Sequence, residues 1–357
     1  MKGSELKSYE PFSQTKDCTV RITDLRSDTV TKPCNDMRNA MHKADVGDDV
    51  FSEDPTVNQL EEMGADILGF ESAIFACSGT QTNLLALLSH CQRGDEYIVG
   101  QQAHTYKYEG GGAAVLGSIQ PQPIEFEADA TLDLTKVKSY IKPDNFHFAK
   151  TRLLCLENSQ GGKALPMDYL AKAATFAKDE GLGLHLDGAR IFNAAIKHDV
   201  AVTTISTHFD SVSVCLSKGL GAPVGSLLCG TRELIAEARR WRKMLGGGMR
   251  QAGIVAAAGI YALQYNTQRL AEDHDNAARL AMGLKEIDQI EVDFHEAQTN
   301  MVYATFPSES VPLLAEFLLQ KGILVSSGET VRLVTHLDIT TADIVQVVTA
   351  YKEFFSR

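Results

Sequence analysis

The stretch Ser213-Val214-Cys215-Leu216-Ser217-Lys218-Gly219-Leu220-Gly221 joins an apolar run to a lysine and a glycine-rich loop. We predict a buried strand over residues 211–216, because the run is short, apolar and contains β-branched valines. A lysine at the end of such a strand is desolvated, which lowers the pKa of its amine and makes the amine available to form a Schiff base. A surface lysine that merely follows a strand is the alternative interpretation of Lys218.

A carboxylate stands at the end of a second strand-like run, in His185-Leu186-Asp187-Gly188-Ala189-Arg190. Asp187 precedes Lys218 by roughly 30 residues, about one strand–helix–strand unit. Two neighbouring parallel strands then deliver the carboxylate and the amine to the same edge of a sheet, where open α/β sheets bind ligands. Pyridoxal 5'-phosphate (PLP) needs both groups, because a carboxylate keeps its pyridine nitrogen protonated. The alternative role for Asp187 is a helix N-cap.

Two further segments offer contacts to this cofactor. The run Cys77-Ser78-Gly79-Thr80-Gln81-Thr82-Asn83 places glycine and hydroxyl residues between a strand-like segment and a leucine-rich helical pattern. Backbone N–H groups at a helix start bind phosphate, so cofactor contacts are expected at Ser78, Gly79 and Thr80; an ordinary capped helix is the alternative. His104 follows the strand-like segment 97–99 and is placed to stack on the pyridine ring, although isolated histidines are more often structural.

Outward from these segments, short apolar strands alternate with helical patterns, which indicates an α/β fold with a mostly parallel sheet covered on both faces. Strands are expected over 73–77, 97–99, 153–156, 184–186, 211–216 and 225–229, with helices over 55–68, 81–91, 134–141, 168–180 and 232–244. A long helical region follows over 251–287, and then α+β patterns with strands near 301–306, 323–326 and 331–334. We expect an N-terminal extension (1–22), a large domain (23–275) and a small C-terminal α+β domain (276–357).

Composition narrows the class of protein. The chain of 357 residues is long enough to bury a core without disulfides or structural metal. Its net charge of −12 argues against nucleic acid and anionic membranes as partners. No apolar run of about 18 residues and no signal peptide is visible. The seven cysteines show neither CxxC pairs nor zinc spacing, so we expect free thiols in the cytoplasm and no metal site.

Taken together, these segments resemble the threonine aldolases, PLP enzymes of the β-eliminating lyase group. Matching runs occur in order along nearly the whole chain, at 24–31, 46–50, 184–192, 215–226, 240–244, 246–251 and 331–336. The resemblance implies the aspartate-aminotransferase-like fold of PLP-dependent transferases. It also implies a homotetramer built from dimers.

The resemblance assigns roles residue by residue. Lys218 is similar to the Schiff-base lysine, Asp187 to the partner of the pyridine nitrogen, and Gly79 and Thr80 to phosphate ligands. His104 resembles the ring-stacking histidine. The groups that hold the substrate carboxylate are matched by Ser27, Arg190 and Arg332. His147 resembles a histidine near the substrate β-hydroxyl, and Lys243 and Arg250 resemble basic residues that reach the cofactor site from a neighbouring subunit.

The implied activity is that of a carbon–carbon lyase that cleaves L-threonine, L-allo-threonine and related β-hydroxy-α-amino acids to glycine and an aldehyde. This places the chain in threonine catabolism and glycine biosynthesis. The base that accepts the β-hydroxyl proton is His147, His104 or a water held by either imidazole. One run departs from the family pattern, because Gln160 stands where the family commonly has a histidine, and glutamine does not titrate.

Rival interpretations remain open at this point. Another PLP-dependent β-eliminating lyase or an aminotransferase needs the same lysine and aspartate. A PLP-binding carrier without turnover is a second alternative. A nucleotide-binding domain is disfavoured, because no GxGxxG or P-loop lysine follows a strand.

Overall fold

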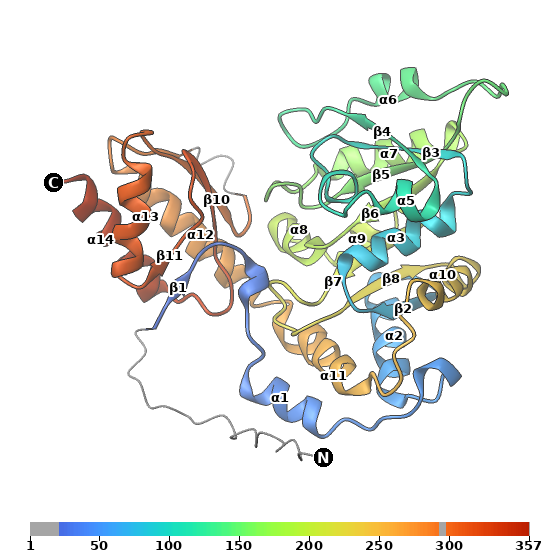
Figure 1. Ribbon diagram of the computed structural model, residues 1–357, viewed down its shortest axis with the longest axis horizontal. Helices are drawn as coiled ribbons and strands as arrows, with labels where there is room; N and C mark the ends of the chain where they lie inside the picture. Colours follow the sequence, from blue (N-terminus) through green and yellow to red (C-terminus); the bar gives the residue numbers. More distant parts are fainter. Residues whose placement is uncertain (1–20, 293–297, 357) are drawn as a thin grey trace, which may run out of the picture.

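The computed structural model describes residues 21–292 and 298–356 (Figure 1). A seven-stranded sheet forms the centre of its larger part, in the order β2-β8-β7-β6-β5-β3-β4. The strands are β2 (Ser72–Ala76), β3 (Asp95–Gly100), β4 (Gln120–Ile124), β5 (Lys150–Glu157), β6 (Gly183–Asp187), β7 (Ser211–Cys215) and β8 (Ser226–Gly230). Among these described strands, only β8 runs against its neighbours. The mostly parallel sheet predicted from the sequence is therefore confirmed.

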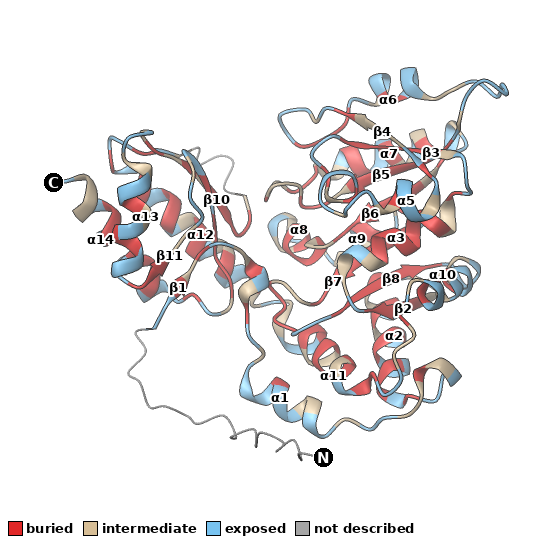
Figure 2. Ribbon diagram, viewed as in Figure 1, coloured by how far each residue is buried: buried red, intermediate tan, exposed pale blue. Residues whose placement is uncertain are grey.

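Helices cover both faces of this sheet, because successive side chains of a strand point to opposite faces. On one face, Leu154 and Leu156 of β5 join a core with α2 (Pro55–Leu68), α7 (Met167–Asp179), α8 (Ile191–His198) and α11 (Gly253–Tyr261). On the other face, Leu153 and Cys155 pack with α3 (Gly79–His90), and α10 (Arg232–Met244) covers β2 and β8. The strands β2, β3, β6, β7 and β8 are accordingly almost wholly buried, whereas the edge strand β4 is mostly half-buried (Figure 2).

The connections carry several short elements that the hydrophobic pattern did not predict. They are α1 (Asn35–His42), α4 (His104–Lys107), α5 (Gly112–Gly117), α9 (Val202–Ser206) and the short turns η1 (Asp28–Val30) and η2 (Asp49–Phe51), whereas α6 (Leu134–Tyr140) agrees with the expected helix. Two of them carry predicted site residues at their starts: η1 directly follows Ser27, and α4 begins at His104. The loops at this edge of the sheet are therefore ordered by short helical turns.

The long helical region expected over 251–287 is present, but it is not one continuous helix. The segment instead forms α11, a π-helical turn η3 (Ala262–Asn266) and α12 (Leu270–Lys285). The side chain of Asn266 donates a hydrogen bond to the carbonyl of Leu220, in the loop that follows Lys218 (2.7 Å). The π turn thus aims an amide at the Lys218 loop, which fits the frequent occurrence of such turns at functional sites.

The C-terminal part has its own three-stranded antiparallel sheet, β12-β10-β9, built from β9 (Glu291–Val292), β10 (Met301–Thr305) and β12 (Thr330–Val334). Its core includes residues of α12, α13 (Val311–Gln320) and α14 (Thr341–Phe355). The chain start joins this part, since β1 (Thr23–Asp24) pairs in parallel with β11 (Ile323–Leu324) and Leu25 lies in the same core (Figure 1). We keep the division into domains of 23–275 and 276–357 as a proposal. Most of the predicted N-terminal extension, residues 1–20, lies outside the described residues.

Within residues 21–292 and 298–356, no helix has the length and apolar character needed to cross a membrane.

Candidate active site

The carboxyl ends of β5, β6 and β7 bring the predicted residues together. β6 and β7 are parallel neighbours in the register His185↔Ser211 and Asp187↔Ser213. Asp187 ends β6, and Lys218 follows β7, so the carboxylate and the amine reach the same edge of the sheet. The geometry expected from the spacing of these two residues is therefore present.

Lys218 is half-buried among acidic and aromatic groups. Its positive charge acts on Asp28, His104 and Glu157, whose pKa values it lowers. Its backbone carbonyl accepts hydrogen bonds from the hydroxyl of Thr31 and the N–H of Gly221, both 2.9 Å long. The loop that carries Lys218 is therefore held by two hydrogen bonds to its backbone.

Asp187 is buried and accepts two hydrogen bonds. The side-chain amide of Asn83 donates to its Oδ2 (2.8 Å), and the N–H of Ala189 donates to its Oδ1 (3.1 Å). Donors on both oxygens stabilise a buried carboxylate. The bond to Ala189 also means that Asp187 orders the start of the following turn, as the capping alternative supposed.

His104 lies between two glutamates. Its Nδ1 is 2.8 Å from Oε1 of Glu109, and its backbone N–H donates to Oε2 of Glu157 (2.7 Å). The hydrogen bond to Glu109 raises the pKa of the imidazole, while partial burial opposes this. One nitrogen of His104 and one carboxylate oxygen each of Glu109 and Asp187 lie within 4.8 Å of one another. The imidazole is thus held at the sheet edge, next to the carboxylate of Asp187.

The start of α3 closes the same site. Ser78 caps this helix by accepting a hydrogen bond from the N–H of Gln81 (3.2 Å), which leaves the N–H groups of the first turn for another acceptor. A Cβ on Gly79 would lie 2.5 Å from Sγ of Cys215, the last residue of β7. A Cβ would therefore force Cys215 or the helix start to move, so glycine lets the start of α3 approach β7 closely.

Arg190 is held by a buried carboxylate that the sequence analysis quoted but did not assign. Its Nε and Nη2 donate to the two oxygens of Asp28, at 2.8 and 2.7 Å. Burial raises the pKa of Asp28, but Arg190, Lys218 and Asn300 together outweigh it and lower the pKa of the carboxyl to about 2. A guanidinium has five N–H donors, so this pair leaves three of them for a further anion.

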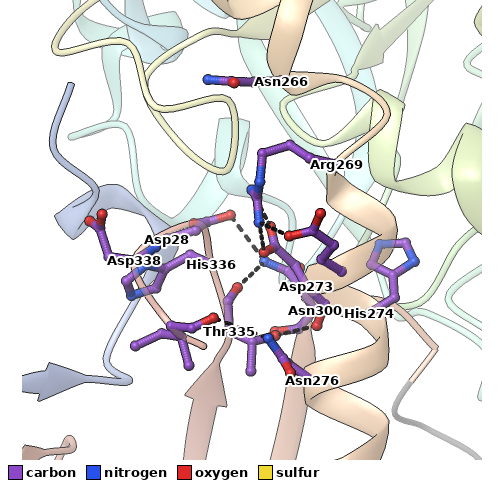
Figure 3. A network of polar contacts seen from close by, with 12 residues as sticks. Asp28, Asn266, Arg269, Asp273, His274, Asn276, Asn300, Thr335, His336 and Asp338 are labelled. Carbon is purple, nitrogen blue, oxygen red and sulfur yellow. Dashed lines mark hydrogen bonds and ion pairs between the residues drawn. The ribbon is translucent and has the colours of Figure 1, made fainter. Parts of the chain in front are cut away.

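Asp28 is in turn tied to the C-terminal part by a buried polar network (Figure 3). Asn300 donates to Asp28 (3.3 Å) and to the carbonyl of Thr335 (3.1 Å), and the hydroxyl of Thr335 donates to the carbonyl of Asp273 (2.6 Å). Asp273 forms an ion pair with Arg269 one helical turn before it. Burial raises the pKa of Asp273 to about 6, against the effect of Arg269. The position of Arg190 therefore depends on contacts with α12, β10 and β12.

Arg332 and Ser27 lie on the rim of this region. Arg332 is exposed on β12, opposite Tyr303 of β10, and donates to the carbonyl of Arg26 (3.4 Å). Burial raises the pKa of Tyr303, while Arg332 and Arg190 lower it, so both arginines act on the same phenol. Oγ of Ser27 accepts hydrogen bonds from the N–H and the hydroxyl of Thr29. Both predicted carboxylate-binding arginines thus face Tyr303.

Three predicted residues are not brought to this site within the chain. His147 is exposed and lies just before β5, near the amino end of that strand, whereas Glu157 lies at the carboxyl end. Lys243 is exposed at the end of α10, and Arg250 forms an ion pair with Asp48 (2.8 Å). A role of these three residues in the site of a neighbouring subunit stays a prediction.

Five residues of the site had no role predicted from the sequence: Asp28, Asn83, Glu109, Glu157 and Tyr303. Asp28 and Asn83 lie inside runs that were quoted for other reasons. A signal existed for Glu157, because a carboxylate ends the apolar run 153–156 as Asp187 ends 184–186. Tyr303 could not be found from spacing, since it comes from the C-terminal part.

Comparisons with known proteins agree with this geometry. The family model of the β-eliminating lyases matches residues 24–306. The low specificity L-threonine aldolase of Escherichia coli K12 is 54% identical over 336 residues, which are 94% of this chain and 100% of that protein.

Solved structures extend the comparison to the fold. A structure of Leishmania major threonine aldolase superposes with a TM-score of 0.81 at 19% identity, over 93% of this chain and 99% of that one. A structure of SPT with PLP gives a TM-score of 0.73 at 17% identity, over 93% of this chain and 87% of that one. The chain therefore has the fold that the sequence analysis expected, the aspartate-aminotransferase-like fold of PLP-dependent enzymes.

Proposed function

Because this chain belongs to the β-eliminating lyase family, we propose that it is a PLP-dependent aldolase that cleaves L-threonine, L-allo-threonine and related β-hydroxy-α-amino acids to glycine and an aldehyde. The reaction breaks the Cα–Cβ bond, which makes the protein a carbon–carbon lyase. The observation that carries the proposal is the meeting of Asp187, Lys218 and the start of α3 at one edge of the sheet.

The residues of this edge fit PLP. The free N–H groups at Gly79 and Thr80, with the capping Ser78, suit the phosphate. Lys218 suits the aldehyde carbon, His104 the face of the ring, and Asp187 the ring nitrogen. When bound, PLP withdraws electrons from Cα of an amino acid and so weakens the bonds to that atom.

The arginines suit the substrate carboxylate. Asp28 fixes the guanidinium of Arg190, so its remaining donors point in one direction and need little reordering when an anion binds. Arg332 and Ser27 would complete the carboxylate site from the rim. Holding the carboxylate determines which bond at Cα stands perpendicular to the ring, and this orientation selects Cα–Cβ cleavage over loss of the α-proton.

The β-hydroxyl proton needs an acceptor near Cβ. Among the described residues, the imidazole of His104 lies beside Asp187 and is affected by the charge of Lys218, and Glu109 holds its Nδ1. His147 would serve only if another subunit presents it. A water held by either imidazole would serve equally, so we propose these groups as the candidate proton acceptors.

We also propose a homotetramer built from dimers. Large apolar side chains are exposed away from the site, including Phe146 at 91% and Met244 at 71% exposure. Exposed apolar surface of this kind marks contacts with another chain. Lys243, next to Met244, and Arg250 would then reach the cofactor site of a neighbouring subunit.

A location in the cytoplasm and a part in threonine catabolism and glycine biosynthesis complete the proposal. All six described cysteines are free thiols, as is usual in a reducing compartment.

The test is an absorbance spectrum of the purified protein and of the variant Lys218→Ala, followed by assays of glycine and acetaldehyde. A visible band that depends on Lys218, with both products formed from L-threonine and L-allo-threonine, is the expected result. A band without cleavage would leave another PLP-dependent lyase, an aminotransferase or a carrier. The absence of any band after addition of PLP would overturn the proposal.

A further inference from the structure

A continuous chain of hydrogen bonds crosses the sheet face beneath α3. We call it the relay, and its members are His90, Ser211, His185 and Asn83. It begins at half-buried His90, which lines a small surface cavity with Gln92, Asp95 and Arg152. It ends at Asp187, to which Asn83 donates.

The backbone explains why these side chains meet. His185 and Asp187 lie two residues apart on β6, so both point to the face that α3 covers, as does Ser211 on β7. Asn83 and His90 lie seven residues apart on α3, about two helical turns, so both point toward the sheet. α3 therefore spans from the carboxyl edge of the sheet to its amino edge, and the relay follows it.

The direction of each hydrogen bond in the relay is determined. The two N–H groups of the Asn83 amide donate to Oδ2 of Asp187 and to Oε1 of Glu109, both at 2.8 Å. Its Oδ1 is therefore an acceptor, and Nε2 of His185, at 3.3 Å, must carry a hydrogen. The opposite orientation of the amide would set Oδ1 against two carboxylates.

The rest of the relay follows from the histidines being neutral. Burial lowers the pKa of His185 to about 3 and that of His90 to about 4. Since Nε2 of His185 carries the hydrogen of a neutral ring, its Nδ1 accepts from the hydroxyl of Ser211 (2.8 Å). The Ser211 oxygen then accepts from Nε2 of His90 (2.8 Å). Every donor in the relay points toward Asp187.

We propose that the relay positions Asp187 and stabilises its negative charge opposite the ring nitrogen of bound PLP. Aligned donors polarise one another in a chain of hydrogen bonds, and in a buried site this raises the donor strength of the last amide, here that of Asn83. A more strongly held Asp187 carboxylate would bind a protonated ring nitrogen more tightly. His185 and Ser211 are then positioning residues that never touch the cofactor.

A second serine on the same strand supports the arrangement. The hydroxyl of Ser213 also donates to Oδ1 of Asn83 (2.5 Å). Together with His185, it saturates the amide oxygen, so Asn83 cannot turn away from Asp187. The orientation of the last donor is thus fixed from two neighbouring strands.

The proposal rests on the proposed function, and the experiment separates the two. Wild type, His185→Leu, His185→Gln and Ser211→Ala are freed of cofactor and titrated with PLP and with the analogue in which CH replaces the ring nitrogen. We expect His185→Leu and Ser211→Ala to weaken PLP binding about three- to tenfold, the equivalent of one hydrogen bond, and to leave analogue binding unchanged. His185→Gln places an amide donor near the former Nε2 and should recover most of the affinity.

The control is Ser206→Ala, which removes a buried serine hydroxyl that donates to the carbonyl of Leu68 (2.6 Å), a hydrogen bond that is not part of the relay. It should leave binding of both ligands unchanged. Equal weakening of PLP and analogue binding in Ser211→Ala would show a merely structural role. No weakening of the binding of either ligand would show that Ser211 has no part in it. Either result would overturn the proposal. Wild type that binds neither ligand would overturn the relay and the proposed function together, whereas binding of PLP by wild type separates the two.

Discussion

Glu157 and Asp187 lie directly opposite each other at the carboxyl ends of β5 and β6, and they are stabilised unequally. Asp187 accepts hydrogen bonds from Asn83 and Ala189, whereas Glu157 accepts one from the N–H of His104. Burial and the charge of Asp187 raise the pKa of Glu157 to about 7. This pKa keeps Glu157 protonated at pH values below about 7, where an ordinary glutamate is already ionised.

This assignment predicts how stability depends on pH. The unfolded chain releases the Glu157 proton near its ordinary value of 4.5, while the folded protein keeps it to about pH 7. Between these values the folded state binds more protons, so the free energy of unfolding falls as pH rises, by a total on the order of 2–3 kcal/mol. Urea unfolding from pH 4.5 to 8 measures this fall in the free energy of unfolding, and Glu157→Gln should abolish it. The control Glu62→Gln changes an exposed position on α2 and should leave the pH dependence of the free energy of unfolding as in wild type. The same pH dependence in Glu157→Gln as in wild type would refute the assignment.

The pair of Asp28 and Arg190 predicts a combined loss of stability and substrate binding. Asp28→Asn leaves the guanidinium of Arg190, whose side chain is only 12% exposed, without its counter-charge. Removing one partner of a buried pair costs about 3 kcal/mol. We also expect KM for L-threonine to rise about tenfold or more, because Arg190 is no longer aimed at the carboxylate, while the visible cofactor band remains.

The control for this prediction is Asp24→Asn, which breaks the exposed pair with Arg26 and should cost less than about 1 kcal/mol. The pH dependence adds a second check. The pKa of Asp28 is lowered from 3.8 to about 2, so its contribution is present above pH 3.8 and is lost as the pH falls toward 2. Wild type should therefore lose stability across that window, and Asp28→Asn should lose less; equal losses would contradict the pairing.

The close approach of Gly79 to Cys215 predicts a loss of cofactor affinity that a second substitution repairs. In Gly79→Ala the new Cβ would lie 2.5 Å from Sγ of Cys215, so the start of α3 must move away from β7. The affinity for PLP, measured by titration of the visible band, should fall at least about tenfold, by analogy with the loss of one charge-assisted hydrogen bond. Cys215→Ala removes Sγ, so the double variant should recover part of this loss. Full affinity in Gly79→Ala alone would show that the helix start does not touch the phosphate.

The sequence pattern predicted the positions of the central strands along the chain, but it did not predict every strand of the sheet. The segments ending at Asp187 and Lys218 are apolar and short, so their strands were predicted within a residue or two. β4 was missed, because Pro121 and Pro123 remove two backbone donors and argue against a strand. The structure places β4 at the edge of the sheet, where one side of the strand needs no partner.

The side chains that hold the catalytic residues in place were not predicted, because most of their partners are distant in the chain. Ser211 and Ser213 alternate with Val212 and Val214, so the strand carries hydroxyls on one face and valines on the other. This alternation indicates a polar seam under a helix, yet it does not say that His90 and Asn83 of α3 supply the partners. Partners such as Asp28 for Arg190 are distant in the chain, so no local pattern predicts them.

His147 leads to the last prediction, because the geometry of one chain separates it from the site. It lies three residues before Lys150, and β5 spans roughly 23 Å from there to Glu157 at about 3.3 Å per residue. If His147 acts on the substrate, it acts in another subunit. Lys218→Ala and His147→Ala should then complement each other when co-expressed, and random pairing should restore about a quarter of wild-type activity. Lys218→Ala with Asp187→Ala should restore none, since one chain supplies both Lys218 and Asp187 to each site. Full activity of His147→Ala by itself would remove His147 from the reaction and leave His104 or a water as the proton acceptor. An inactive His147→Ala that Lys218→Ala fails to complement would contradict its action in another subunit.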